Sequence, residues 1–387
     1  MSSSIPIGLI GTGGRLRGIV RRLTEAEPRL RITAAYDPME QSHTDLRGQL
    51  GYDYRIARSE AEVLADPAIQ WVLIGSWNCF HARQAVAALE AGKNVFCEKP
   101  LATTLEDCLA IRDAAERSGK TFAFGLVLRY SPHYQRLHEI VTSGVIGRIL
   151  SFEFNETLGF NHGGYIFRNW RRSRANAGTH LLEKCCHDLD LANWITGSLP
   201  VKVASFGGRD LFRPENAALV AKIGPSPKGD APYASWGCPE SVDPFDGTAD
   251  IFDNQVAILQ YANGIRGTFH TNVNTAIQER RFYLCGTEGT IRADVVTGLI
   301  ETQRIGWETQ KEVVNTGSEG GHGGGDEVMT EALVNAIVHG KAPLTSVSHG
   351  LRSAIAAFGI DQAVDEDRVV DLTPLWKKAG IDPACGG

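Results

Sequence analysis

The first 125 residues alternate short apolar strands with longer amphipathic segments, and this alternation constrains the fold more than any other feature of the sequence. The predicted strands are Ile5–Ile10, Leu30–Tyr36, Trp71–Ile74, Asn94–Cys97 and 121–124. Helix patterns at 82–91 and 105–118 lie between the later strands. Strands and helices that alternate at this spacing indicate a parallel sheet with crossover helices. We therefore expect an α/β domain with a doubly wound parallel sheet over residues 1–125.

A glycine-rich turn follows the first strand. Gly11, Gly13 and Gly14 precede a helical pattern, and this context lets the backbone approach a pyrophosphate at the helix N-terminus. Leu16 stands where the usual Gly-x-Gly-x-x-Gly pattern has its third glycine. The motif alone is weak evidence, but its position after a strand predicts a Rossmann dinucleotide-binding site.

The second predicted strand ends in Asp37-Pro38, about two dozen residues after the turn. An acidic side chain there is placed to accept hydrogen bonds from ribose hydroxyls and to repel a 2′-phosphate. Asp37 therefore favours NAD over NADP, whereas Arg15 is the one feature that could still admit NADP. The alternative is an ordinary Asp-Pro turn after a strand.

Glu98-Lys99-Pro100 ends the fourth strand, Asn94–Cys97. The proline prevents the strand from continuing with a normal backbone donor. Ligands of such sheets bind at the carboxyl ends of the strands, so Lys99 is placed to reach a substrate oxygen. A solvated lysine at a strand-to-helix corner is the alternative.

Several motifs resemble, in order and spacing, the Gfo/Idh/MocA oxidoreductases, which are relatives of glucose–fructose oxidoreductase and inositol dehydrogenase. The resemblance covers most of the chain and is carried by the Gly-x-Gly turn, Asp37, Asn78-x-x-His81, 88–93, Glu98-Lys99-Pro100, 129–132 and 144–147. It implies NAD as the cofactor and Lys99 as the residue that touches the reacting hydroxyl. The cofactor-binding residues expected on this basis are Gly11, Gly13, Gly14, Arg15, Asp37, Ser76, Trp77, Asn78, His81, Glu98 and Lys99.

From Ile149 onward the sequence alternates as antiparallel strands do. Hairpins are predicted for 255–273, turning at Asn263-Gly264, and for 282–293. Residues 207–250 are irregular and long enough to predict a functional loop. We expect an α+β domain over 126–387 with a large, mostly antiparallel sheet. The resemblance implies that this domain covers the nicotinamide end and forms a homodimer or homotetramer.

A single helix is predicted between Gly178-Thr179 and Gly197. Glu183, His187, Asp190 and Trp194 would share one of its faces, so the carboxylate could hold the tautomer of a histidine that acts as general base. An amphipathic helix whose polar stripe meets water is the alternative. The resemblance favours catalysis, with His187 matching the family's Asp-x-x-x-His motif. Glu183 replaces the usual aspartate, and Lys184 and the cysteine pair also depart from the pattern.

Two further segments are candidates for substrate binding. Four arginines in 168–174 form either a solvated basic loop or a pocket for a carboxylate, phosphate or sulfonate. The glycine-rich segment 317–325 is either a flexible hinge or a loop that brings His322 over a sugar. The predicted substrate contacts are Arg129, Tyr165, Trp170, Arg171, Arg172, Arg174, Lys184 and His322.

Composition excludes several classes of protein. A 43% hydrophobic, 22% charged chain with net charge −6 is typical of a globular protein and not of a general nucleic-acid or anionic-membrane binder. No stretch is long and apolar enough to span a bilayer, and no targeting signal is evident, so a cytoplasmic location is expected. The cysteines are expected to be reduced. Cys185-Cys186-His187 is not expected to bind a metal, because adjacent residues on a helix point in different directions.

The leading hypothesis is an NAD-dependent dehydrogenase of a sugar, polyol or glycoside. His187, assisted by Lys99, would remove a hydroxyl proton while hydride passes to nicotinamide. The alternative is a redox-neutral, NAD-dependent glycosidase that oxidises, eliminates, hydrates and re-reduces, and the arginines would suit an anionic sugar. A nucleotide-sensing regulator on the same fold is a third hypothesis, which Lys99 and His187 argue against.

Overall fold

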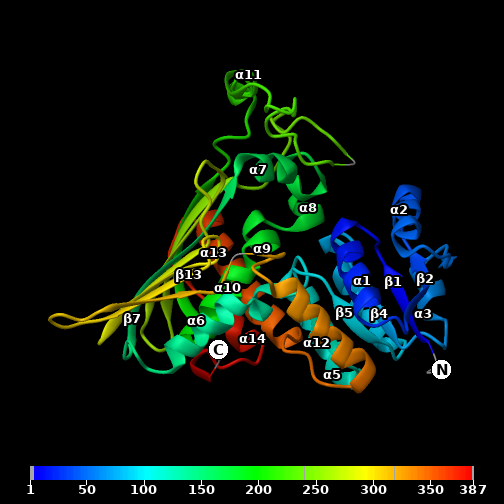
Figure 1. Cartoon of the computed structure of the whole chain (residues 1–387), viewed down its shortest axis with the longest axis horizontal. Helices are drawn as coiled ribbons and strands as arrows, with labels where there is room; N and C mark the ends of the chain where they lie inside the picture. Colours follow the sequence, from blue (N-terminus) through cyan, green and yellow to red (C-terminus); the bar gives the residue numbers. More distant parts are fainter. Residues whose placement is uncertain (1–3, 239, 318, 386–387) are drawn as a thin grey trace. The chain divides into compact units, whose positions relative to one another are not determined.

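The computed structural model describes residues 4–238, 240–317 and 319–385, and it divides into two compact units (Figure 1). The first unit contains residues 1–131 and 320–354. The second contains residues 132–319 and 355–387.

The first unit is built on a six-stranded parallel sheet, as predicted. Its strand order is β3-β2-β1-β4-β5-β6, and every pairing is parallel. The strands are β1 (Ile5–Ile10), β2 (Leu30–Tyr36), β3 (Arg55–Ile56), β4 (Trp71–Ile74), β5 (Asn94–Cys97) and β6 (Phe122–Phe124). The helices are α1 (Gly14–Ala26), α2 (Glu40–Leu50), α3 (Glu60–Leu64), α4 (His81–Glu90), α5 (Leu105–Ser118) and α12 (Gly325–His339), with 3₁₀ turns η1 (Asn78–Phe80) and η2 (Val127–Tyr130).

The strand order places the predicted cofactor motifs at one edge of this sheet. The order runs outward in both directions from the neighbouring strands β1 and β4, which is the switch point where α/β sheets bind nucleotides. The glycine turn follows β1, the Ser76 loop follows β4, and Glu98-Lys99-Pro100 follows β5. Parallel strands end at the same edge, so these three segments share it.

The missing third glycine of the turn is compensated elsewhere in the first unit. Leu16 lies in α1 and is buried. A Cβ added to Gly75, just after β4, would meet Leu16 Cβ at 2.6 Å. Close packing between helix and strand is what the third glycine normally permits, so Gly75 supplies on the strand side the space that Leu16 fills.

The division of the chain differs from the predicted boundary in one respect. The break at Ser131/Pro132 lies near the expected residue 125, but 320–354 belong to the first unit and not to the second. The reason is α12, whose Met329, Leu333 and Ala336 are buried in the same core as Leu16 and Ile19 of α1. An apolar helix pattern does not reveal which core the helix will join.

The second unit contains a nine-stranded sheet in the order β14-β13-β12-β11-β7-β10-β9-β8-β15. All its pairings are antiparallel except β7 with β10, so the predicted mostly antiparallel sheet and both hairpins are confirmed. The strands are β7 (Ile149–Gly159), β8 (Pro200–Gly208), β9 (Asn254–Tyr261), β10 (Arg266–Thr275), β11 (Arg281–Gly286), β12 (Gly289–Asp294), β13 (Leu299–Arg304), β14 (Lys311–Asn315) and β15 (Val370–Asp371).

The second unit also contains several short helices and 3₁₀ turns. They are α6 (Pro132–Thr142), α7 (Phe160–Phe167), η3 (Trp170–Arg172), α8 (Arg174–Ala177), α9 (His180–Lys184), α10 (Cys186–Thr196), η4 (Pro214–Asn216), α11 (Leu219–Ile223), α14 (Thr373–Lys378) and η5 (Pro383–Cys385). The longest helix, α13 (Val347–Asp365), contains the division between the units.

The predicted single helix from 178 to 197 is wrong in its middle. Its ends are as expected, since Thr179 caps the start through its side chain and Gly197 ends it with φ +61°. The helix breaks at Cys185 into α9 and α10. The thiol of Cys185 packs against Glu156 and Thr271 of the sheet, a contact that helical periodicity does not encode.

The predicted irregular segment 207–250 packs into a small hydrophobic core that it shares with α7 and with the ends of β7 and β10. Phe212, Tyr233 and Phe245 pack on one another and on Phe167 of α7. The Asp253 carboxylate accepts hydrogen bonds from the backbone N–H groups of 210–212 and so holds the start of the loop. Figure 1 shows the loop extending from the region of α7 to α11 at the top of the view. The segment is therefore a folded loop and not a loose connection.

Among the described residues, every helix is either too short or too polar to cross a lipid bilayer.

Candidate active site

The glycine turn after β1 has the geometry of a dinucleotide-binding turn. Gly11 has φ +77°, and a Cβ there would lie 2.4 Å from the Ser76 backbone nitrogen. Gly13 is the N-cap of α1 and, as a glycine, has no side chain to cap the helix. A Cβ on Gly14 would meet nothing within 4 Å. The N-terminus of α1 is therefore uncrowded at Gly14, and a helix N-terminus favours a phosphate. These residues fit NAD.

Asp37 ties the end of β2 to this turn. Its Oδ2 accepts hydrogen bonds from Thr12 N (2.6 Å) and Thr12 Oγ1 (3.2 Å), and its Oδ1 accepts one from Met39 N (2.8 Å). The Oδ1 atom has a further lone pair, so Asp37 can still accept a hydrogen bond from a ribose hydroxyl. The negative charge is therefore fixed at the ribose end of the predicted site.

The loop after β4 is braced against the Lys99-Pro100 corner by His81. His81 is buried, and its Nδ1 lies 2.7 Å from the Pro100 carbonyl while its Nε2 lies 3.3 Å from the Ser76 carbonyl. Burial lowers the pKa of His81, so the ring is neutral and donates through one nitrogen. His81 therefore supports the Ser76 loop and the Pro100 corner from the protein interior. Two other predicted cofactor residues lie in the same loop: Asn78 is buried, and Trp77 is partly exposed.

Lys99 follows β5, and the Glu98 side chain fixes the corner on which it sits. Glu98 N donates to the Ile74 carbonyl (3.0 Å), and Glu98 Oε2 accepts from Lys99 N (3.1 Å). Glu98 Oε1 accepts from Arg15 Nε at 3.0 Å. The peptide bond between Lys99 and Pro100 is cis. Glu98 therefore links the backbone of Lys99 to α1, the helix that follows the glycine turn.

Arg15 is held between two carboxylates. Its Nη1 lies 2.7 Å from Asp326 Oδ1, at the start of α12. Asp326 Oδ2 also accepts from His322 Nδ1 (3.0 Å). Burial opposes the ionised form of Asp326, but the hydrogen bond from His322 and the charge of Arg15 outweigh it and hold the Asp326 pKa well below its usual range. Arg15 is thus engaged within the protein, which weakens it as a candidate for binding the 2′-phosphate of NADP.

The glycine-rich segment before α12 is a close-packed loop in its described part. A Cβ on Gly321 would lie 2.1 Å from Asp326 Oδ2, and one on Gly325 would lie 2.6 Å from the Val127 carbonyl. Ser131 Oγ donates to the Gly323 carbonyl. His322, a predicted substrate contact, therefore belongs to the same unit as Lys99 and is oriented by Asp326. The predicted substrate residue Arg129 is buried in this unit, within η2.

The other two predicted catalytic residues, Glu183 and His187, lie in the second unit on either side of the break at Cys185. Glu183 Oε1 accepts from Arg171 Nε at 3.0 Å, and Arg171 Nη1 donates to Tyr165 Oη at 3.3 Å. His187 is buried on α10, as are Asp188 and Asp190. The water-facing amphipathic helix considered as the alternative is therefore wrong for α10.

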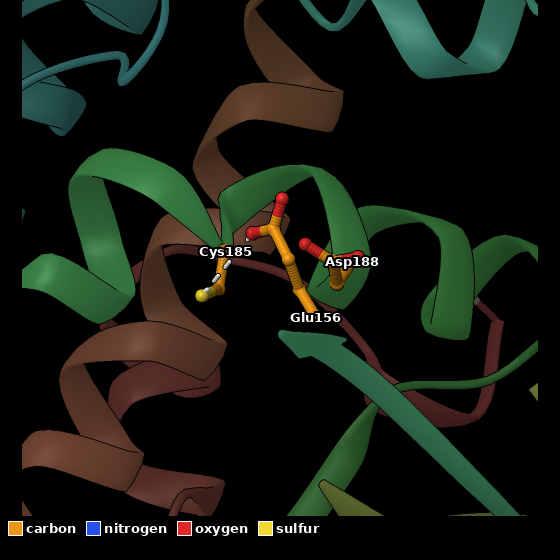
Figure 2. Close-up of side chains that lie close together, drawn as sticks. All are labelled: Glu156, Cys185 and Asp188. Carbon is orange, nitrogen blue, oxygen red and sulfur yellow. Dashed lines mark hydrogen bonds between the residues drawn. The ribbon is translucent and has the colours of Figure 1, made fainter. Parts of the chain in front are cut away.

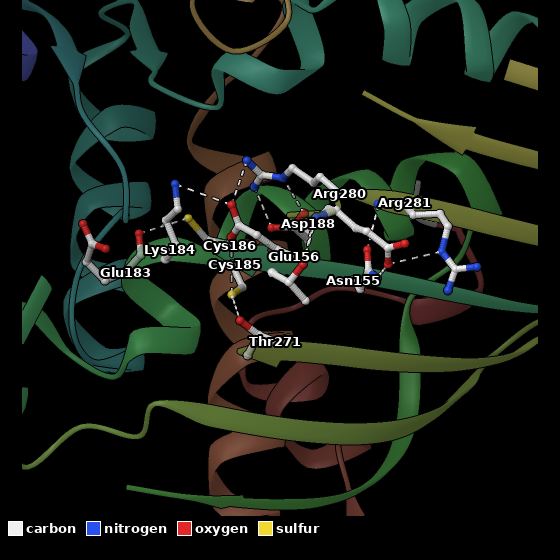
Figure 3. Close-up of polar contacts among 12 residues, drawn as sticks. Asn155, Glu156, Glu183, Lys184, Cys185, Cys186, Asp188, Thr271, Arg280 and Arg281 are labelled. Carbon is white, nitrogen blue, oxygen red and sulfur yellow. Dashed lines mark hydrogen bonds and ion pairs between the residues drawn. The ribbon is translucent and has the colours of Figure 1, made fainter. Parts of the chain in front are cut away.

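A cluster of four charged side chains joins α9 and α10 to the sheet (Figure 3). Arg280 donates in bidentate fashion to Asp188 (2.8 and 2.7 Å) and its Nη1 lies 2.9 Å from Glu156 Oε1. Lys184 Nζ lies 3.5 Å from the same oxygen. Burial, and then the neighbouring Glu156 charge, raise the pKa of Asp188 against the lowering effect of Arg280. Arg280 and Lys184 instead lower the pKa of Glu156 to about 2 against the effect of its burial.

Glu156, Cys185 and Asp188 come close enough together to suggest a metal site (Figure 2). The donor set does not suit one, because Arg280 already binds both carboxylates with a fixed positive charge. Burial and the two carboxylates raise the pKa of the Cys185 thiol well above its usual value, so it is not a thiolate. The cluster is better described as an internal ion-pair network.

The arginines of 168–174 anchor the folded loop. Arg172 is buried and pairs with Asp246 and Thr248. Arg168 donates to the carbonyls of 234 and 236. Arg174 pairs with Asp365 at 3.5 Å. Arg171 lies 4.3 Å over the Trp170 ring. The solvated basic loop is therefore wrong, and the anion pocket gains no support from these contacts.

Sequence reasoning missed several residues that organise the site. No motif marks Asp326, Glu156, Arg280 or His162. The contact between Glu156 and Cys185 joins residues 29 positions apart in the chain, and that between Asp326 and Arg15 joins residues 311 positions apart. The seven cysteines with described side chains are free thiols, and four of them are buried.

Replacing Asp326 with Asn should lower the free energy of unfolding by about 3 kcal/mol near pH 7, because Arg15 loses a buried partner. A carboxylate with a depressed folded pKa stabilises the protein above its unfolded pKa, and this contribution is lost as pH falls through the folded pKa. The defect should therefore shrink in acid. Chemical denaturation at two pH values measures it. Asp45→Asn, at a partly exposed pair with Arg17, should cost less than about 1 kcal/mol.

Arg280→Met should lower stability by about 3–5 kcal/mol, since two buried carboxylates lose their shared cation. The adjacent Arg281→Met is the matched control, because its ion pairs are longer and partly exposed. Adding Glu156→Gln and Asp188→Asn to Arg280→Met should restore part of the loss. Equal effects of the two arginine variants on thermal unfolding would contradict the buried network.

Two family models match the chain. The model described as "Oxidoreductase family, NAD-binding Rossmann fold" matches residues 5–126. The model described as "Oxidoreductase family, C-terminal alpha/beta domain" matches residues 138–372. Both boundaries lie near the division between the units at Ser131/Pro132.

Individual proteins are similar at lower identity. YteT of Bacillus subtilis (strain 168) is 24% identical over 363 residues, which are 80% of this chain and 83% of YteT. Inositol 2-dehydrogenase 3 of Saccharopolyspora erythraea is 39% identical over 145 residues, 37% of this chain and 42% of that enzyme. A solved levoglucosan dehydrogenase in complex with NADH and levoglucosan has the same fold, with a TM-score of 0.78 at 20% identity over 96% of this chain and 100% of that one. With its Rossmann turn, Asp37 and both domain matches, the chain belongs to the Gfo/Idh/MocA family of NAD-binding oxidoreductases.

Proposed function

We propose that the protein oxidises a secondary hydroxyl of a sugar or polyol and transfers the hydride to NAD. The observation that carries this proposal is the position of Lys99. It follows β5 at the edge of the sheet that carries the glycine turn, on a corner that Glu98 and Arg15 fix. A cation fixed beside a cofactor is suited to an alkoxide that develops during the reaction.

The proposed chemistry divides between a proton and a hydride. NAD, when bound, accepts the hydride from the carbinol carbon at C4 of its nicotinamide. In our proposal His187 accepts the hydroxyl proton, and Lys99 stabilises the oxygen while that proton leaves. Glu183 is bound by Arg171, so we assign it a positioning role in the second unit. The products are a ketone, NADH and one proton, which balances the two-electron oxidation.

The substrate class rests on the relatives and on the polar side chains of the second unit. Two similar proteins are named inositol 2-dehydrogenase and levoglucosan dehydrogenase, and both names specify a carbohydrate or cyclitol. Glu183, Lys184 and Arg171 offer charged hydrogen-bonding groups on neighbouring helices of this unit. A polyhydroxylated substrate suits such groups because each hydroxyl both donates and accepts.

A redox-neutral glycosidase that uses bound NAD is the second hypothesis. Two sequence features motivate this hypothesis: the pair Glu183-Lys184, and His322 as an additional candidate acid or base. Lys184 pairs with Glu156, and His322 is held by Asp326. These contacts favour neither reaction, so the glycosidase stays a prediction that the assay below tests.

NADH formation should be observed at 340 nm when the protein and NAD are incubated with myo-inositol, levoglucosan or methyl glucosides. Lys99→Met and His187→Asn should each lower kcat by about 100-fold or more, because each removes a group that acts on the reacting hydroxyl. Lys120→Met and His270→Asn are matched controls at exposed positions and should leave kcat unchanged.

The same experiment separates the two hypotheses. Release of nitrophenol from a nitrophenyl glycoside without added NAD, and without net NADH, would identify the glycosidase. A protein that binds NAD but shows neither reaction with these compounds would contradict both.

We also propose that the protein is a homo-oligomer that covers the outer face of the nine-stranded sheet. Phe206 and Val256 lie opposite each other on β8 and β9, and Ile258 is two residues further along the same face. Their exposed fractions are 70%, 47% and 62%. An exposed apolar cluster of this kind is typical of an interface, and a second copy can bury it by two-fold symmetry.

Light scattering coupled to gel filtration should give a mass of two or four chains. Ile258→Asp should shift the protein towards the monomer, since it places an unpaired charge in the interface. Ile277→Asp, at an exposed isoleucine outside this cluster, should not change the mass. A wild-type monomer at all concentrations would refute the proposal.

A further inference from the structure

An aromatic ledge lies in the second unit where α7 meets the folded loop. It consists of His162, Tyr165 and Trp236. The centroid of the Trp236 ring is 4.6 Å from that of His162 and 5.7 Å from that of Tyr165. Trp236 is nevertheless 47% exposed, so much of its surface is not used by this packing.

The ledge is built into the protein by backbone contacts. Arg168 at the end of α7 donates to the carbonyls of Ala234 and Trp236, and a Cβ on Gly164 would lie 2.1 Å from the Tyr233 carbonyl. Tyr233 N donates to Asn161 Oδ1 (2.9 Å). After Trp236, the Cys238 thiol donates to the Arg168 carbonyl (3.2 Å). The loop is therefore tied to the α7 segment on both sides of Trp236, and these contacts hold the exposed tryptophan in place.

His162 is an uncharged member of the ledge. Burial, and then the positive charge of Lys184, lower the pKa of His162 to about 3. At neutral pH its imidazole therefore has one donor and one acceptor nitrogen. The ledge thus combines an apolar ring surface with a neutral hydrogen-bonding group.

A chain of contacts joins the ledge to the predicted catalytic residues of the same unit. Tyr165 Oη accepts from Arg171, and Arg171 donates to Glu183. The Glu183 charge also acts on the His162 pKa, so the carboxylate and the ledge are electrostatic neighbours. A ligand lying on Trp236 would therefore lie beside the charged groups around Glu183 and Lys184.

We propose that this ledge is a carbohydrate subsite in which a pyranose ring stacks on Trp236 and hydrogen-bonds His162. This inference rests on the proposed function and deepens it by naming a cyclic sugar as the substrate class. A pyranose has an apolar face of C–H bonds and a rim of hydroxyls, which match the exposed indole surface and the neutral imidazole. Sites that bind small molecules commonly combine apolar walls with a few polar groups in this way.

Trp236→Ala should weaken the binding of methyl β-D-glucopyranoside by about three- to tenfold, the range expected for losing one aromatic contact. The binding of the open-chain polyol sorbitol should change less, because it presents no flat ring face. Saturation-transfer NMR on the NAD complex measures binding, and steady-state kinetics should show the change in KM with little change in kcat.

Trp307→Ala is the matched control, since Trp307 is 99% exposed and lies outside the ledge. Trp236→Phe should retain most of the affinity, which guards against a loop that merely unfolds. His162→Phe keeps a ring but removes the hydrogen bond, and it should weaken ring sugars as well.

The outcomes separate this inference from the proposed function. Equal losses for glucoside and sorbitol in Trp236→Ala, or no loss for either, would overturn the subsite. Sugar binding that depends on Trp236, without NADH formation by the wild-type protein, would refute the dehydrogenase and keep the subsite. A wild-type protein that binds no ring sugar would refute the subsite directly.

Discussion

The ion pairs of Arg15 are the interaction on which the cofactor half of the molecule depends. One guanidinium joins the first turn of α1, the Glu98 corner after β5 and the start of α12. These segments are far apart in sequence, and each carries a predicted functional residue. A cation that stands between two buried carboxylates fixes their separation, because moving either one would expose an uncompensated charge. The geometry around Lys99 is therefore set by electrostatics as much as by the strand that precedes it.

The second unit uses buried charge in a similar way. Arg280 satisfies Asp188 and Glu156, so a helix with a buried Asp188 can pack against a sheet. Such a network contributes little net stability compared with apolar packing, but breaking it is costly. We infer that it holds α9 and α10 in their broken arrangement, with Glu183 and His187 on either side of Cys185.

Local patterns were enough to predict much of this fold. Strand β1 and helix α5 have the predicted bounds, because apolar runs between turn residues and a Thr104 cap are local signals. The placement of α12, the break at Cys185 and the partners of Arg168–Arg174 depend on contacts between distant segments, and no local period encodes these. Asp37 and Glu98 were recognised from their position after strands. Asp326 had no such mark, since its importance comes from its contacts with Arg15 and His322 in the folded chain.

The folded loop of 207–250 has a consequence for how this protein can diversify. Phe212, Tyr233 and Phe245 give the loop an aromatic core, which packs on Leu158 and Val273 near the ends of β7 and β10. Substitutions near its tip therefore need not disturb the framework that holds the reacting groups. The loop is in this sense an exchangeable module, and closely similar chains could acquire different preferences by replacing this one segment while retaining the same hydride chemistry.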